Sequence, residues 1–125
     1  MPTVLSIWLF GGLGALARYG VDRGFPLRAG LRFPWAILIV NISGAFAIGL
    51  LAALFAGRFD GAQPWLKTAL TVGFLGGYTT FSAFSLDTFR LLDAGRVAAA
   101  FGNGLGSLAL GVLAAWAGLR FGRTI

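Results

Sequence analysis

The sequence predicts an all-α membrane protein with four transmembrane helices. The chain has 125 residues, of which 58% are hydrophobic and only 11% charged, whereas a soluble domain carries roughly 25% charged residues. Its mean hydropathy is +0.84. The apolar residues form four blocks, about 4–21, 35–56, 65–92 and 97–119, and each is close to or above the ~20 residues that cross a bilayer. We therefore predict one four-helix transmembrane domain over residues 1–125.

The first block, about 4–21, is predicted to be a retained span. The residues before it, Met1-Pro2-Thr3, lack the positive charge of a secretory signal, and no convincing cleavage site follows. Arg18 lies near the end of this span, where a basic side chain can reach the headgroups.

The second block, about 35–56, begins at Trp35 after a proline, as interfacial aromatic residues do. It carries Asn41 and Ser43, and the fourth block, about 97–119, carries Asn103 and Ser107 on one helix face. Taken singly, Ser43 or Ser107 is best interpreted as a bridge between helices, which contributes ~0.6 kcal/mol on average. Asn41, taken with the polar cluster of the third block, favours a functional role.

The third block, about 65–92, contains residues that a simple span does not need. Gly76 and Gly77 are followed by Thr79 and Thr80. Broken backbone at membrane depth is tolerated only where it is buried in protein or lines a polar cavity, and transporters often bind ions at such breaks. We predict that the third helix is broken here, so that the carbonyls of Gly76 and Thr79 can coordinate a monovalent cation, because carbonyl oxygens suit hard cations.

The polar groups in the middle of the spans are all neutral. Hydroxyls follow the break at Ser82, Ser85 and Thr88, and the nearest carboxylate, Asp87, lies toward the end of the third span. A proton-coupled or cation exporter needs an acid inside the membrane, whereas N–H and O–H donors suit a small anion. Phe81 and Phe84 could add the positive edges of their rings, or they could simply pack.

Other residue counts exclude further classes of site. The chain has no cysteine and no histidine, which excludes disulfides, thiolate or imidazole metal ligands and histidine proton relays. Its net charge of +6 comes from basic residues scattered among loops, so we interpret them as headgroup anchors and predict no nucleic-acid binding. No ATP-binding or catalytic motif is present, so the chain is not expected to be an enzyme.

The basic residues are divided almost evenly between the two sides of the membrane. One side receives Arg23, Arg28, Arg32, Arg90 and Arg96, and the other receives Arg58, Lys67, Arg120 and Arg123, with Arg18 adding at most one to the first set. The positive-inside rule needs a clear asymmetry to set orientation. One orientation can still prevail through local effects. The alternative is dual insertion, in which oppositely oriented chains pair.

Three segments, Gly11–Tyr19, Val40–Phe46 and Gly73–Asp87, together resemble the Fluc (CrcB) family of small bacterial fluoride channels, and the resemblance continues through Asn103–Ser107. It implies a fluoride-selective passive channel of the bacterial inner membrane that exports cytoplasmic fluoride. It further implies an antiparallel, dual-topology homodimer among membrane lipids, with two pores and a structural sodium ion (Na+) on the twofold axis.

The resemblance also implies roles for individual residues. Asn41 matches the pore asparagine, and Phe81 and Phe84 match the paired pore phenylalanines. Gly76 and Thr79 match the carbonyl ligands of sodium. The polar track beside the phenylalanines is matched by Ser82, Ser85 and Thr88. Arg18 matches the first-span arginine, whose role is either to attract anions or to stabilise the structure. The chain departs from the usual pattern at Tyr78, Ala83 and Asp87.

Two other classes remain open from the residues alone. A small dual-topology multidrug exporter also has four short spans, but it requires an acid in mid-span. A structural membrane assembly subunit would explain the glycines, but it would not explain the polar cluster around Thr79.

Overall fold

The computed structural model describes residues 1–25 and 33–125. Three helices, α1 (Thr3–Gly24), α2 (Trp35–Ala56) and α6 (Val97–Gly122), are long and apolar enough to cross a membrane. Between α2 and α6 the chain forms α3 (Pro64–Thr68), the π-helix η1 (Ala69–Leu75), α4 (Gly76–Tyr78) and α5 (Phe81–Asp93). The described residues thus form an all-helical bundle. Arg28 and Arg32, which entered the predicted charge count, lie outside the described residues.

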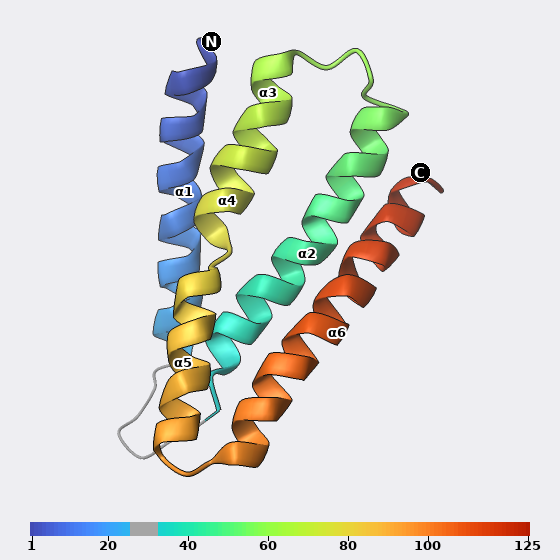
Figure 1. The fold of residues 1–125 in the computed structure, drawn as a ribbon. Helices are drawn as coiled ribbons and strands as arrows, with labels where there is room; N and C mark the ends of the chain where they lie inside the picture. The colour runs from blue at the N-terminus through green and yellow to red at the C-terminus, as the bar shows by residue number, and fades with distance from the viewer. Residues whose placement is uncertain (26–32) are drawn as a thin grey trace.

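The helices run alternately up and down, with both termini and the start of α3 at the same end (Figure 1). In this arrangement α2 and α6 run parallel and pack along their lengths, while α1 packs against η1 and α4. The helix α5 lies against α6 and starts where α4 stops.

Glycines bring the backbone of α1 into direct contact with the third run of helices, which consists of α3, η1, α4 and α5. A Cβ atom on Gly14 would overlap the carbonyl of Phe74, and one on Gly77 would overlap the carbonyl of Gly11. Small residues permit such close helix approach in membranes, where no hydrophobic effect drives helices together. Gly49 and Gly118 make the equivalent contacts between α2 and α6.

The space around the Cβ position also distinguishes two pairs of glycines that are each spaced four residues apart. Gly73 and Gly77 pack on α1 within the chain. Gly102 and Gly106, on α6, have nothing within 4 Å of the position that a Cβ atom would take. The first pair therefore serves intrachain packing, while the second lies on a face that the chain itself does not cover.

A tight turn returns the chain from α5 to α6. Gly95 has a φ of 75°, a left-handed conformation that glycine adopts without steric cost. Its N–H donates to the Leu92 carbonyl (2.9 Å), and the N–H of Arg96 donates to the Leu91 carbonyl (2.8 Å). These bonds satisfy two carbonyls in the last turn of α5, as is common where a helix ends at a glycine.

Candidate functional site

The third run of helices is interrupted for two residues. After α4 ends at Tyr78, Thr79 (φ −81°, ψ 158°) and Thr80 (φ −152°, ψ 122°) are extended, and α5 begins at Phe81. The interruption lies midway along the bundle, beside α1 and α2 (Figure 1). The N–H of Thr79 still donates to the carbonyl of Leu75 (2.9 Å), whereas the N–H of Thr80 leaves the regular helical hydrogen-bond ladder.

The side chain of Asn41, on α2, bonds both backbone groups of Thr80. Its Nδ2 donates to the Thr80 carbonyl oxygen (3.0 Å), and its Oδ1 accepts from the Thr80 N–H (2.9 Å). In a continued α-helix that N–H would donate to the carbonyl of Gly76, four residues earlier. The Asn41 amide thus takes the donor that Gly76 would otherwise have used.

The Thr80 side chain starts the next helix. Its Oγ1 accepts from the N–H of Ala83 (3.2 Å) and lies 3.2 Å from the Ser82 hydroxyl, the pattern of a threonine N-cap. In a continued helix Ala83 would have bonded the carbonyl of Thr79 instead. Thr80 therefore accounts for the release of two carbonyls, those of Gly76 and Thr79, which are the two predicted cation ligands.

Gly76 and Thr79 line one cavity together with Asn41. The cavity has a volume of about 330 Å³ and is also lined by Gly44, Ala45, Ile48, Thr71 and Leu75. No carboxylate is among its lining residues, and the described residues hold no group of three or more acidic, histidine or cysteine side chains that could bind a metal. Any cation here would be held by neutral oxygens.

The two predicted pore phenylalanines lie at the start of α5. The ring centroids of Phe81 and Phe84 are 5.8 Å apart and the rings are tilted by 44°. Phe81 is 79% exposed in the single chain, although the residue beside it, Thr80, is held at the break. The Phe81 ring therefore projects away from the rest of the chain.

The predicted hydroxyl track continues along α5. Ser85 Oγ donates to the carbonyl of Phe81 (2.9 Å), and Thr88 Oγ1 donates to that of Phe84 (2.8 Å). The Thr88 hydroxyl in turn accepts from Nδ2 of Asn103, a buried residue of α6 (2.9 Å). The track is thus tied to α6 at its lower end.

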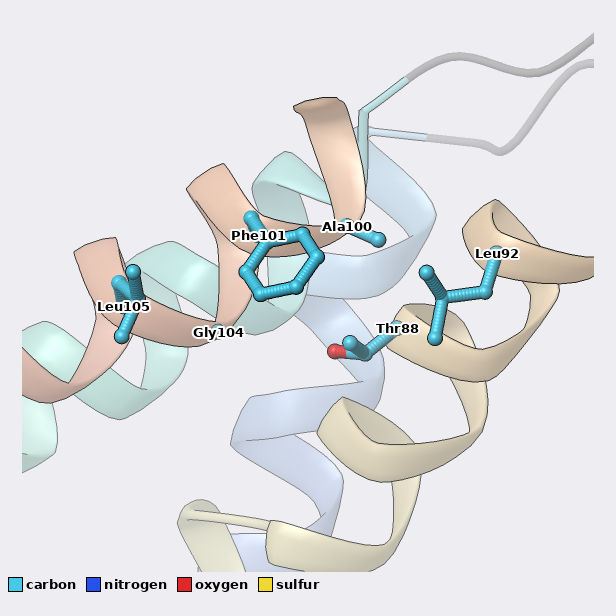
Figure 2. A pocket seen from close by; sticks show the side chains of 6 residues that line it. All are labelled: Thr88, Leu92, Ala100, Phe101, Gly104 and Leu105. Carbon is cyan, nitrogen blue, oxygen red and sulfur yellow. The ribbon is translucent and has the colours of Figure 1, made fainter. Parts of the chain in front are cut away.

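Beyond this bond lies an apolar hollow of about 260 Å³ between α5 and α6. Its lining residues are Thr88, Leu92, Ala100, Phe101, Gly104 and Leu105. Figure 2 shows the hydroxyl of Thr88 directed from α5 toward α6, as the one polar group among these side chains.

Arg18 lies apart from the break. It lines a separate cavity of about 370 Å³ between α1 and α5, shared with Asp22, Asp87 and Arg90. The buried carboxylate of Asp87 is 3.8 Å from the guanidinium of Arg90. The structure therefore places the first-span arginine in a cluster of mixed charge, and it does not bring this residue to Asn41 or the phenylalanines.

The two serines interpreted as helix bridges differ. Ser43 Oγ lies 2.9 Å from the hydroxyl of Tyr78 and donates to the carbonyl of Val40 (3.1 Å), so it joins α2 to α4 as expected. Ser107 Oγ is buried and has no hydrogen-bond partner among the described residues, so the expected bridge is not found there.

Sequence reasoning did not single out Thr80 as a site residue. Its backbone binds Asn41 and its side chain caps α5. A signal was available, because a threonine at the junction of two helical segments is a strong N-cap candidate. The Asn41–Thr80 pairing had no local signal, since 39 positions separate the two residues.

These features define a multi-pass α-helical membrane protein. The family described as CrcB-like protein, Camphor Resistance (CrcB), matches residues 5–119, and the chain belongs to this family.

Curated relatives match over essentially the whole chain. The chain is 46% identical to a fluoride-specific ion channel FluC of Geobacter sulfurreducens, with 100% of both chains covered. It is 44% identical to a fluoride-specific ion channel FluC of Coxiella burnetii, with 98% of both covered. A third relative, fluoride-specific ion channel FluC 1 of Nitrobacter hamburgensis, is 45% identical over 98% of this chain and 96% of its own.

Proposed function

We propose that this protein is a passive, fluoride-selective channel of the bacterial inner membrane, that it exports cytoplasmic fluoride, and that it is not an enzyme. The observation that carries the proposal is full-length identity of 42–46% to relatives named as fluoride-specific channels. The neutral polar groups at the break support it, because N–H and O–H donors can replace the hydration shell of a small anion. An exporter driven by protons is not favoured, since no acid lines the cavity at the break.

Passive export needs no energy source other than the membrane potential. Hydrogen fluoride is a neutral weak acid that crosses membranes and ionises inside, where the anion is trapped. An inside-negative potential drives a monovalent anion outward with ~2.3 kcal/mol per 100 mV. A selective pore is therefore sufficient to keep the cytoplasmic concentration low.

The proposed path follows the second span and α5. Asn41 retains one Nδ2 hydrogen beyond its bond to Thr80, since an amide nitrogen carries two, and this hydrogen can donate to the anion. The ring edges of Phe81 and Phe84 carry positive potential, and the track then continues over Ser82, Ser85 and Thr88. The hydroxyls of Ser85 and Thr88 must release a carbonyl before they can donate to an anion. Arg18 would act from its own cavity, either attracting anions or holding α1 to α5.

We propose that two chains of opposite orientation form the working unit. The near-even division of basic residues supports dual insertion. The exposure of Phe81 and the uncovered Gly102 and Gly106 face support a second copy as the cover. A pore residue that projects away from its own subunit forms a complete path only when a partner closes it.

A structural sodium ion fits the carbonyls at the break. Gly76 and Thr79 lose their helical donors to Asn41 and Thr80, and carbonyl oxygens are suitable ligands for a hard cation. When bound, the ion would neutralise these dipoles and supply positive charge near the anion path. On a twofold axis, two chains would each contribute the same pair of carbonyls.

The orientation of the chains can be tested by thiol labelling in cells, and the dimer by measuring the mass of the purified protein. The chain has no cysteine, so Asp93→Cys, at the exposed last residue of α5, introduces the only thiol. We expect an impermeant reagent to label about half of the molecules in intact cells, as dual insertion requires. The purified dimer should dissociate when sodium is replaced by a large organic cation. Complete labelling from one side would contradict dual insertion. A dimer that stays intact without sodium would contradict the structural sodium ion.

The function itself is tested by ion efflux from proteoliposomes. Vesicles loaded with fluoride or with chloride are compared at the same potential, with protein-free vesicles as the control. We expect rapid fluoride efflux and no chloride efflux above the control. Equal rates for both anions would reject selectivity, and fluoride efflux no faster than from protein-free vesicles would reject the function.

A further inference from the structure

We propose that Asn41 is a positioning residue, which acts through Thr80 to keep the third helix broken. Its amide binds both the N–H and the carbonyl of Thr80. It replaces the Gly76 carbonyl as the acceptor for the Thr80 N–H, and it adds a donor to the Thr80 carbonyl. This role is additional to the donation of a hydrogen bond to an anion. The inference rests on the proposed function only for the purpose that the break serves.

The break would be costly without this partner. In the membrane interior an unpaired backbone N–H or carbonyl costs several kcal/mol, so a span normally satisfies every such group within its helix. Thr79 and Thr80 are β-branched and tolerate extended backbone well, but intrinsic preference alone does not pair the Thr80 groups. Asn41 pairs both of them at once, because an amide carries a donor and an acceptor side by side.

The bond to Asn41 also helps to keep the carbonyls of Gly76 and Thr79 free. While the Thr80 N–H is held by Asn41, it cannot donate to Gly76, and while Thr80 is extended, its Oγ1 can cap Ala83. If Thr80 became helical, Gly76 and Thr79 would both regain their usual donors. Asn41 therefore affects two carbonyls that it does not itself contact. It also helps to determine that α5 begins at Phe81.

The test measures backbone conformation at the break by ¹³C chemical shifts in detergent micelles. Asn41→Leu removes both hydrogen bonds while nearly preserving side-chain size. Ser43→Ala is the matched control, because Ser43 is on the same helix and bonds Tyr78 and Val40 but not Thr80. Thr80→Ser keeps the capping hydroxyl and the backbone bonds and serves as the conservative variant.

We expect the shifts of Thr79 and Thr80 to move from extended toward helical values in Asn41→Leu alone. Two neutral hydrogen bonds of ordinary net strength bias the extended state by roughly 30-fold. Ser43→Ala and Thr80→Ser should keep the extended shifts. Shifts of α2 residues above the site, such as Gly49, should stay unchanged in all variants, which separates this effect from general unfolding.

Extended shifts at both threonines in Asn41→Leu would overturn the proposal. Loss of fluoride efflux with unchanged shifts would likewise overturn it, because the loss would then come only from the missing donor to the anion. The proposed function fails differently, through a parent protein that carries no fluoride. In that case the shifts still decide whether Asn41 holds the break.

Discussion

Replacing Phe81 or Phe84 with isoleucine is expected to abolish fluoride efflux from a protein that still folds. Isoleucine keeps the side chain apolar and of comparable bulk, and such swaps usually cost less than ~1.5 kcal/mol of stability. The substitution removes the positive ring edge. The two rings lie 5.8 Å apart beside the break, so an anion passing them would lose the stabilisation that the replaced ring edge supplies. A rise of ~1.4 kcal/mol in the barrier already slows efflux about tenfold.

Efflux is measured from proteoliposomes containing equal amounts of each variant, and size-exclusion profiles establish that the assembly is intact. Phe89→Ile is the matched control, since Phe89 is on the same helix and is 62% exposed but lies outside the proposed path. The control should conduct like the parent. If Phe81→Ile and Phe84→Ile also do, the rings only pack, and the anion passes elsewhere.

Gly14→Val is expected to prevent the protein from folding stably. A Cβ atom at Gly14 would overlap the carbonyl of Phe74 and crowd the backbone nitrogen of Tyr78. Both obstacles are backbone atoms of the third run, so no side-chain rotation can relieve them and the two helices must separate. Overpacking typically costs 1–3 kcal/mol, occasionally more, and a collision of backbone with backbone belongs at the upper end.

The matched control is Gly12→Val, on the same helix, where nothing lies within 4 Å of a Cβ atom. Valine is a better helix former than glycine, so the control should retain the parent stability. The readouts are the yield of monodisperse protein and its thermal midpoint in detergent. Similar midpoints for the two variants would show that α1 and the third run can separate without loss.

The sequence by itself determined the all-helical class, the apolar crossings and the family. Hydropathy determines the class and the crossings, because a bilayer demands long apolar runs that satisfy their own backbone. The family follows from the three motif segments instead. The motif around Gly76–Thr80 also located the candidate site, since glycines and threonines at mid-span are informative on their own.

Only the tertiary structure decided which groups meet. It paired Asn41 with the backbone of Thr80, placed Gly14 against Phe74, and put Arg18 in a cavity separate from the break. It also divided the two glycine pairs between a contact within the chain and an uncovered face. Composition and spacing describe the face and environment of one helix at a time. Contacts between helices depend on how far each is rotated and shifted against its neighbours, and these are set by the packing of the whole bundle.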